Sequence, residues 1–158
     1  MTLIGTSKLN PMKTLFEEEF LICRFDEENK ILYHIWLDKA KGDVFRNALL
    51  KVLDFYKTLK SSYPTLHWLG DTTKLSVLPI ADQKWLDETW NELLFVDAGV
   101  KTHAVIIGDD AFARYAMDKF KNSMNQKYAA QNIILETFKD EAAAYNWFKM
   151  LNTSQLQE

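Results

Sequence analysis

The chain has few of the residues that several large classes of functional site require. Its only cysteine, Cys23, rules out an intramolecular disulfide and any zinc or iron–sulfur site built from several cysteines. Its five glycines stand singly, so no glycine-rich loop is available for a phosphate or a dinucleotide. Neither a Gly-x-Ser-x-Gly elbow nor a cysteine–histidine signature is present. We therefore expect no enzymatic activity and no cofactor, and we expect Cys23 to be a small buried residue of a strand.

A basic excess and long apolar runs are also missing. The formal net charge is -3 and the isoelectric point is near 5.6, so the chain has no broad basic field and nucleic-acid binding is disfavoured. No apolar run approaches the roughly 20 residues that cross a bilayer. The first 14 residues lack the charged and apolar segments of a secretory signal. We expect a cytoplasmic protein without a membrane span.

What the chain does contain is enough apolar material for one folded domain. Of its 158 residues, 47% are hydrophobic and 13% are aromatic, including five tryptophans. This composition argues against intrinsic disorder. A domain of this length can bury roughly 70% of the surface that its unfolded chain exposes. A sizeable core is therefore expected.

The hydrophobic pattern divides the chain into one domain and two short ends. Residues 1–14 mix small, polar and apolar types and predict a loosely ordered lead-in, and residues 152–158 predict a polar tail that frays. Residues 15–151 contain no linker or internal repeat and predict a single domain. Within that domain, residues 15–37 hold two apolar segments on either side of the polar residues 26–30, which predicts a β-hairpin.

Helical and strand patterns alternate beyond the hairpin. Apolar residues recur at helical spacing within 44–59, 86–94, 112–120 and 143–151, and short apolar runs indicate strands near 66–69, 104–107 and 133–138. The expected N-caps are Asp43, Asp82, Asp140 and either Asp109 or Asp110, and Gly99 suits a helix exit. This order predicts an α/β fold with a mixed, mostly parallel sheet, an N-terminal hairpin and about four helices.

The segment Asp71-Thr72-Thr73 is the most suggestive junction in the chain. It follows the apolar strand at 66–69 and precedes a tryptophan-rich helix. Functional residues of α/β folds gather at the carboxyl ends of strands. An acidic residue with two hydroxyls can hold a metal, present a hydroxyl for phosphorylation, or satisfy local backbone donors in a turn. Of these, the turn is the most frequent role for such residues.

This junction and the order of elements resemble the STAS family, named for sulfate transporters and anti-sigma-factor antagonists, and within it the SpoIIAA-like branch. The resemblance runs from about Phe16 to Leu151. The residues that carry it are Trp36, Asp71, Lys84-Trp85, His103-Ala104-Val105-Ile106, Phe138, Asp140-Glu141-Ala142 and Trp147-Phe148. Most of them are positions in strand or helix cores, so the resemblance bears on the fold more than on any activity.

The resemblance implies a non-enzymatic regulatory or protein-interaction module. In partner-switching STAS proteins, an Asp-Ser or Asp-Thr pair at this junction presents a phosphorylatable hydroxyl, and Asp71-Thr72 matches that pair. The small residues that follow in such proteins, in a Ser-Gly-Leu-Gly type sequence, are replaced here by Thr73-Lys74-Leu75-Ser76. STAS proteins are also linked to the SEC14 lipid-binding class, which implies an alternative function as a carrier of a small apolar ligand.

Other residues offer further candidate chemistry. The carboxylates Asp71, Asp109 and Asp110 follow two apolar strands and would suit a magnesium ion in a phosphoryl-transfer enzyme, which is the third hypothesis. N-capping is the commoner role for such aspartates. The histidines at 34, 67 and 103 have no spacing that brings them together, so we expect three partly buried, hydrogen-bonded side chains and no metal site.

Surface positions suggest how the chain meets other molecules. Trp85 lies about 70° away from the apolar stripe of its helix and is expected to cover a boundary, a groove or a partner. The candidates for the lining of an apolar cavity are Trp85, Trp90, Phe95 and Tyr115, although core packing is commoner. The hairpin leaves an edge strand that invites self-association, which the run 17–19 of glutamates opposes. We expect an unknown protein partner and a monomer or small homodimer.

Overall fold

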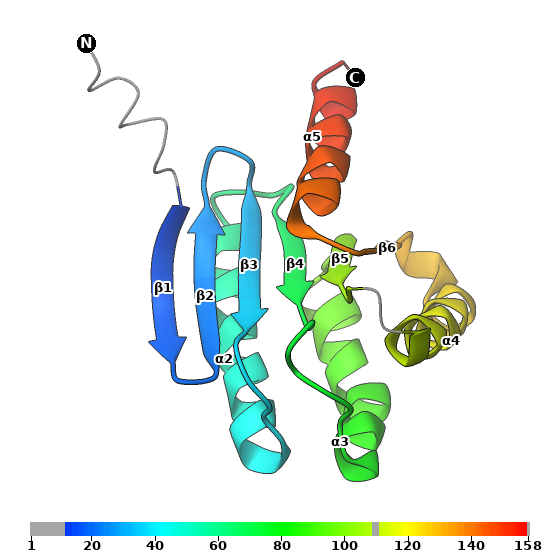
Figure 1. Cartoon of the computed structure of the whole chain (residues 1–158). Helices are drawn as coiled ribbons and strands as arrows, with labels where there is room; N and C mark the ends of the chain where they lie inside the picture. Colours follow the sequence, from blue (N-terminus) through cyan, green and yellow to red (C-terminus); the bar gives the residue numbers. More distant parts are fainter. Residues whose placement is uncertain (1–11, 109–110, 158) are drawn as a thin grey trace.

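The computed structural model describes residues 12–108 and 111–157, and it shows one six-stranded sheet with helices on both faces (Figure 1). The strands are β1 (Met12–Glu18), β2 (Leu21–Asp26), β3 (Ile31–Trp36), β4 (His67–Asp71), β5 (Thr102–Ile106) and β6 (Ile134–Phe138). The α-helices of the described residues are α2 (Gly42–Lys60), α3 (Ile80–Trp85), α4 (Ala111–Lys127) and α5 (Glu141–Gln157). Two π-helical segments, η1 (Leu86–Trp90) and η2 (Leu93–Asp97), extend α3, and a 3-10 turn, η3 (Ala129–Gln131), follows α4.

The strands lie in the sheet in the same order as in the sequence, from β1 to β6. The pairs β1–β2 and β2–β3 are antiparallel, whereas β3–β4, β4–β5 and β5–β6 are parallel. The prediction of an α/β fold with a mixed sheet, an N-terminal hairpin and about four helices is confirmed. Because successive parallel strands advance in one direction, right-handed crossovers place their connecting helices on one face. Figure 1 shows α2 behind β2 and β3, on that face.

Each face of the sheet has its own apolar cluster. The first cluster joins side chains of the sheet to those of α2, η1, η2 and α4, and it includes Val52, Trp68, Trp90, Phe95 and Met124. The second joins the opposite face to α5 through Ala144 and Phe148, which are fully buried. Strand residues alternate between the clusters, since neighbouring side chains of a strand point to opposite faces. The sequence pattern of β3, apolar on both faces, is explained by this double cover.

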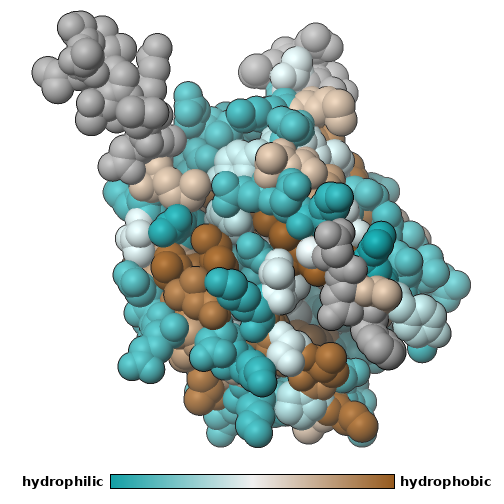
Figure 2. All heavy atoms as spheres, viewed as in Figure 1, coloured by the Kyte–Doolittle hydropathy of each residue, from teal (hydrophilic) through white to brown (hydrophobic). Residues whose placement is uncertain are grey.

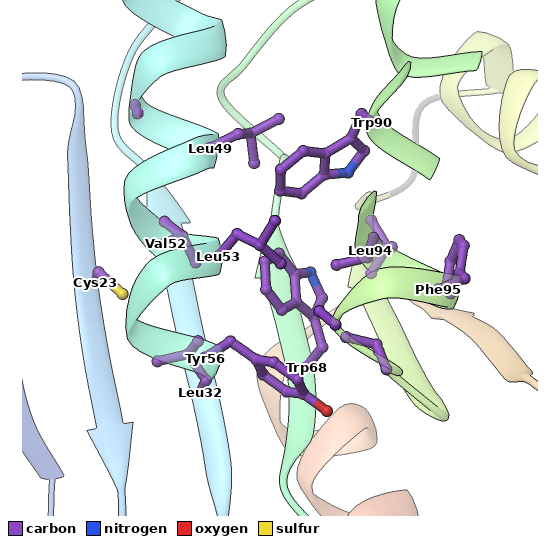
Figure 3. Close-up of a cluster of buried hydrophobic side chains, with 14 of the residues drawn as sticks. Cys23, Leu32, Leu49, Val52, Leu53, Tyr56, Trp68, Trp90, Leu94 and Phe95 are labelled. Carbon is purple, nitrogen blue, oxygen red and sulfur yellow. The ribbon is translucent and has the colours of Figure 1, made fainter. Parts of the chain in front are cut away.

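The indole of Trp68 lies at the centre of the first cluster (Figure 3). Its ring centroid is 5.0 Å from that of His34, 5.7 Å from that of Tyr56 and 5.9 Å from that of Trp90. Figure 3 shows the ring between α2, which carries Tyr56 and Leu53, and the helical segment that carries Trp90. Aromatic rings packed edge to face contribute beyond the area that they bury. The Trp68 ring therefore contacts ring side chains from β3, α2 and η1 at the same time.

The start of the sheet differs from the sequence-based prediction. Residues 15–37 were predicted to form one hairpin of two strands, but three antiparallel strands are present, and β1 takes up residues 12–14 of the expected lead-in. Residues 1–11 of that lead-in lie outside the described residues. The pairing of β1 with β2 shifts between Thr14 and Phe16, which marks a β-bulge. An edge strand with a bulge and exposed charges has little apolar alternation, so its sequence carries a weak strand signal.

Helix boundaries show which cap predictions hold. Asp140 caps α5, because its Oδ1 accepts the N–H of Ala143 at 2.9 Å. The prediction for Asp43 is wrong, since α2 begins at Gly42 with Lys41 as its N-cap residue. The polar-tail prediction also needs correction, because α5 continues to Gln157. Asp109 and Asp110 lie outside the described residues. Gly99 has φ +71° just after η2, as expected of a residue at a helix exit.

Part of one sheet face carries no helix among the described residues. The helix α5 packs mainly on β4, β5 and β6, and on the same face of β2 Ile22 and Arg24 are partly exposed. Ile22 and Ile35 are paired across β2 and β3, and both are partly exposed. Figure 2 shows an apolar patch over these strands within a mostly hydrophilic face. Isolated apolar residues on a protein surface are common, so this patch alone indicates no function.

Candidate functional site

The predicted site residues Asp71, Thr72 and Thr73 form a tight turn at the end of β4. Asp71 is the last residue of β4, and its Oδ1 accepts the N–H of Thr73 at 3.0 Å. Thr72 donates twice to the carbonyl of Ile106, from its backbone N–H at 3.0 Å and from its hydroxyl at 3.1 Å. The N–H of Leu75 then bonds to the Thr72 carbonyl at 3.1 Å. These residues thus form the predicted turn, and the hydrogen bonds of Thr72 join the end of β4 to β5.

The two hydroxyls of the turn differ in accessibility. Thr72 is partly buried and its hydroxyl is already donating to Ile106, whereas Thr73 is exposed. The helix α3 begins at Ile80, eight residues after Thr72, so a phosphate on Thr72 would not meet the backbone N–H groups of a helix N-terminus. The hydroxyl of Thr73 is therefore the more accessible of the two.

Replacing Thr72 with alanine is expected to lower the free energy of unfolding by about 1 kcal/mol, because the carbonyl of the buried residue Ile106 loses one of two donors. Thr73→Ala is the matched control and should change stability by less than about 0.5 kcal/mol, since its side chain is exposed. Urea titration followed by tryptophan fluorescence measures both values. Equal costs for the two variants would contradict the role assigned to the Thr72 hydroxyl.

The segment 74–80 leads from the turn into α3 and presents two apolar side chains to solvent. Val77 is 81% exposed and Ile80 is 82% exposed, whereas Leu75 between them and the turn is buried. The side-chain amide of Gln83 donates to the Leu78 carbonyl at 2.7 Å. The carbonyl of Pro79 accepts the N–H groups of Asp82 and Gln83 at 3.0 Å each. The segment is thus held at both ends while Val77 and Ile80 point outward.

Trp85 covers the boundary between α2 and α3, one of the roles expected for it. Its ring stacks on that of Trp90 with centroids 5.8 Å apart and meets the Phe45 ring at 6.4 Å. The guanidinium of Arg46 lies 5.7 Å above the same ring, within the range of a cation–π interaction. Trp85 therefore belongs to the contact between the two helices, and its side chain is partly exposed.

The same Arg46 also contacts a buried carboxylate, that of Asp82, for which the sequence predicted another role. Asp82 was predicted to cap a helix, but α3 begins at Ile80 and Asp82 is 1% exposed. Its Oδ2 accepts the N–H of Gly42 at 2.8 Å, and its Oδ1 accepts from the Arg46 guanidinium at 3.0 Å. Asp82 thus satisfies a backbone donor at the start of α2 rather than one in its own helix. No local pattern reveals this pairing, because 40 residues separate the partners.

The three histidines do not converge on a metal site. His34 and His103 point into the first cluster from β3 and β5, whereas His67 lies on the opposite face against Phe148. His67 Nε2 donates to Asn152 Oδ1 at 2.7 Å, and its Nδ1 lies 2.5 Å from the Thr102 hydroxyl. Among residues 12–108 and 111–157, no three histidine, cysteine, aspartate or glutamate side chains are placed to hold a metal ion.

Two of these histidines are buried in the first cluster. His34 Nδ1 accepts the indole N–H of Trp36 at 3.1 Å, whereas no atom of the described residues forms a hydrogen bond with His34 Nε2 or His103 Nδ1. Burial lowers the pKa of each of the two imidazoles to about 3. The neighbouring Cys23, directly opposite His34 on β2, is buried, and desolvation raises its thiol pKa to about 12. Neutral imidazoles and an inert thiol are therefore expected at neutral pH.

The aromatic residues proposed as a cavity lining are divided between core and surface. Trp90 and Phe95 are 5% and 0% exposed and pack against Trp68 and His103, whereas Tyr115 is 65% exposed. A surface hollow of about 580 Å³ lies elsewhere, at the end of the sheet opposite the turn at Asp71. Its lining is mostly polar: Glu28, Asn29, Lys30, Thr65, Lys149, Asn152 and Thr153. The helix-covered aromatic residues thus fill the core.

Sequence reasoning placed the turn and Trp85 correctly in the chain but could not join distant groups. Two features depend on how distant elements align with one another. They are the bond from Asp82 to Gly42 and the position of His34 and His103 on the strands on either side of β4. A histidine within each of two apolar strands was the one available signal for the latter. Of the predicted set Asp71, Asp109 and Asp110, only Asp71 is described, so their mutual distances are not defined.

Comparisons with known proteins identify no relative of this chain. In the part of the chain that the structure covers, no helix is long and apolar enough to span a membrane. Comparison of the chain with protein-family models, with curated proteins and with solved structures gives no match.

Proposed function

We propose that this chain is a non-enzymatic, regulatory protein-interaction module with a STAS-like fold, and that it binds a protein partner through the docking loop, residues 72–80. The observation that carries the proposal is the exposure of Val77 and Ile80, at 81% and 82%. Val77 and Ile80 are three residues apart in the chain, and exposed apolar surface commonly marks a site of protein–protein contact when it is contiguous. Their position after the carboxyl end of β4 agrees with the usual place of functional residues in α/β folds.

The docking loop is organised before any partner arrives. Thr72 anchors its start to β5, Leu75 is buried beneath it, and Gln83 holds the Leu78 carbonyl near its end. A loop already fixed in its bound shape loses little conformational entropy on binding. Val77 and Ile80 would then act as apolar anchors that enter a pocket on the partner, as buried anchors do at the centre of many interfaces.

Regulation by phosphorylation is the finer part of this proposal. A phosphate on Thr73 or Thr72 would add about -1.5 to -2 charges beside the apolar anchors. Such a charge would repel a partner pocket that is apolar or acidic. Thr73 is the better acceptor, because its side chain is exposed and the Thr72 hydroxyl is bonded to Ile106. This reading preserves the regulatory role that the STAS resemblance implies and moves the acceptor by one residue.

The two other candidate functions have less support. A carrier of an apolar ligand was suggested by the aromatic residues, but Trp90 and Phe95 pack in the core. Ligand crevices of open α/β sheets lie where the strand order reverses, and the order here runs from β1 to β6 without a reversal. Metal-assisted phosphoryl transfer would need Asp109 and Asp110 beside Asp71, and those two residues lie outside the described ones.

The docking loop is tested by capture from an extract of cells that make the protein, with bound proteins quantified by mass spectrometry. The baits are the unmodified chain, Val77→Asp, Ile80→Asp and the control Met150→Asp, whose side chain is 62% exposed on α5. We expect a partner that the unmodified chain and the control retain equally. Each loop variant should retain it at least about tenfold less, because a charge would enter an apolar contact.

Two outcomes of this capture experiment would contradict the proposal. A partner lost equally by all three variants, or by none, would place the contact elsewhere on the molecule.

Thr73→Glu in the same experiment should lower capture as the loop variants do if phosphorylation regulates docking. Circular dichroism of every bait must match that of the unmodified chain, since both loop substitutions are at exposed positions and should leave the fold intact.

A further inference from the structure

The strand β1 forms one edge of the sheet (Figure 1), and it pairs with another strand on one side only. Among the described residues, no strand meets its outer side. In an antiparallel ladder, about half of the backbone N–H and C=O groups of an edge strand point outward. Groups of this kind can pair with a strand from another chain. The outer side of β1 is therefore a surface on which a further strand can bind.

The β-bulge in β1 decides the face on which each charged side chain lies. Side chains of residues directly opposite in a ladder point to the same face. Lys13 is opposite Phe25 and Glu18 is opposite Leu21, and both of these partners belong to the first cluster. In a regular strand, residues an odd number of positions apart lie on opposite faces. Because the bulge adds one residue between them, Lys13 and Glu18 lie on the same face.

Two apolar side chains lie between these charges on the same face. Leu15 and Phe16 are partly buried and pack against the first cluster. The Phe16 ring stacks on that of Phe55 of α2, with centroids 5.6 Å apart. Lys13 and Glu18, in contrast, are exposed. On this face β1 thus has an apolar centre, with a cation toward one end of the strand and a carboxylate toward the other.

This order of side chains is complementary to itself. When a second copy of β1 lies antiparallel to the first, with the two-fold axis between Leu15 and Phe16, Lys13 is opposite Glu18 of the second copy. Both side chains lie on the face of the first cluster, so the ammonium and the carboxylate meet across the strands. The two-fold axis repeats the pair, because such an interface uses the same surface of both copies. Opposite charges directly across an antiparallel pair stabilise it.

The glutamates of residues 17–19 do not oppose this register, although they were expected to discourage self-association. Glu17 is opposite Thr14 of the second copy. Glu17 and Thr14 share the other face of the sheet, since they lie opposite Ile22 and Arg24 of β2. Glu19 lies beyond β1, in the turn to β2. In this register, therefore, no glutamate of β1 faces another glutamate.

The other edge of the sheet lacks this complementarity. The strand β6 is last in the sheet, and Glu136 is its central residue. Antiparallel pairing of two copies of β6 about their centres would place Glu136 opposite Glu136 of the second copy. Like charges directly opposite destabilise a strand pair. The Lys121 ammonium already lies 2.6 Å from Glu136 Oε1 within the same chain. The edge that is complementary to itself is therefore β1.

The helices on the sheet leave room for pairing at β1. Figure 1 shows α2 behind β2 and β3. Strands lie about 4.8 Å apart, so about four strand spacings, or ~19 Å, would separate the α2 helices of two copies. A helix with its side chains is about 10–12 Å wide. The two helices therefore do not collide, and the side chains of Leu15, Phe16 and Phe55 from both copies would lie between them.

We propose that β1 joins two copies of this chain edge to edge, in a two-fold symmetric dimer with one continuous sheet. This inference goes beyond the proposed docking function and does not depend on it. The docking loop follows β4, three strands away from β1, so both loops of the dimer stay free. A pair of single strands buries little surface, so the dimer is weak and depends on protein concentration.

Sedimentation equilibrium of the unmodified chain at micromolar and submillimolar concentrations tests the dimer. The mass should rise from that of one chain, 18.4 kDa, toward twice that value. Amide hydrogen exchange at the same concentrations tests the edge, since exchange within β1 should slow at the higher concentration while exchange within β6 stays unchanged. A single-chain mass at both concentrations would overturn the proposal and leave the β1 edge to an extended segment of another protein. A stable mass above the dimer, or equal slowing at both edges, would also overturn it.

Charge reversal tests the register. Lys13→Glu places two glutamates opposite each other at both ends of the interface and should raise the dissociation constant at least about tenfold. Glu18→Lys should have a similar effect by opposing two lysines. The double variant Lys13→Glu/Glu18→Lys restores opposite charges, and its constant should return to within about threefold of that of the unmodified chain. A double variant as weak as the single ones, or single variants that associate as well as the unmodified chain, would overturn the proposed interface.

A matched control separates these contacts from the effect of net charge. Lys149→Glu changes the net charge by the same amount as Lys13→Glu, at an exposed position of α5. It should change the dissociation constant less than about twofold, because salt screens exposed charges that are far apart. An effect as large as that of Lys13→Glu would show that net charge decides association and would overturn the assignment to β1. The measurements on the unmodified chain decide the proposal if a variant fails to fold.

Discussion

Replacing Gly70 with alanine is expected to lower the free energy of unfolding by about 3 kcal/mol, because the new methyl group would overlap a buried imidazole. An ideal Cβ at Gly70 would lie 2.6 Å from Cε1 and 2.8 Å from Nε2 of His34. The His34 ring cannot easily move aside, since Trp36 donates to its Nδ1 and Trp68 packs 5.0 Å from its centroid. Urea titration monitored by circular dichroism measures the cost.

The double variant separates this overlap from the general effect of alanine in a strand. In a His34→Ala background the imidazole is gone, so Gly70→Ala should then cost less than about 1 kcal/mol. The difference between the two costs is the interaction energy of the pair. A cost that is equal in both backgrounds, or one below about 1 kcal/mol in the unmodified background, would show that the sheet absorbs the methyl group and that the close approach is not a constraint.

Replacing Asp82 with alanine is expected to lower the free energy of unfolding by about 3 kcal/mol, because two donors lose a buried acceptor at once. The Gly42 N–H at the start of α2 and the Arg46 guanidinium both bond to this carboxylate, at 2.8 and 3.0 Å. The Asp82 side chain is 2% exposed, so water cannot readily replace it, whereas that of Arg46 is 29% exposed and recovers part of its hydration. The same denaturation measurement applies.

Two controls test this reading of Asp82. Asp82→Asn keeps one oxygen as an acceptor but loses the charge, so its cost should lie between zero and that of the alanine variant. Asp97→Ala removes a surface ion pair with Lys57, also 3.0 Å long but with side chains 57% and 45% exposed, and should cost less than about 0.5 kcal/mol. An Asp82→Ala cost as small as that of Asp97→Ala would mean that burial adds nothing to this ion pair.

The fold class was accessible from the sequence because its evidence is local. The period of apolar residues in 44–59 predicts α2, and the continuous apolar run near 104–107 predicts a buried parallel strand, which is β5. Neither inference needs a distant partner. The cap at Asp140 is equally local, since a side chain at a helix start bonds to an N–H three residues on.

The candidate site was only partly accessible, for a related reason. The turn at Asp71–Thr73 follows from residue types that bond to their own backbone, and the structure contains those bonds. The difference between Thr72 and Thr73 does not follow, because it depends on the Ile106 carbonyl, 34 residues away on β5. Exposure of Val77 and Ile80 was likewise beyond the sequence, since helical periodicity does not say how a preceding loop packs.

By itself, the sequence determined a single α/β domain, its principal helices and the absence of several site motifs, because composition and periodicity act over a few residues. Only the tertiary structure decided the β1 edge strand, the uninterrupted strand order and the bond from Asp82 to Gly42. It also decided that the Trp68 ring lies near both His34 and His103. These features arise when strands pair in register and helices pack on them. The free energies involved belong to contacts between residues far apart in the chain, which no local pattern records.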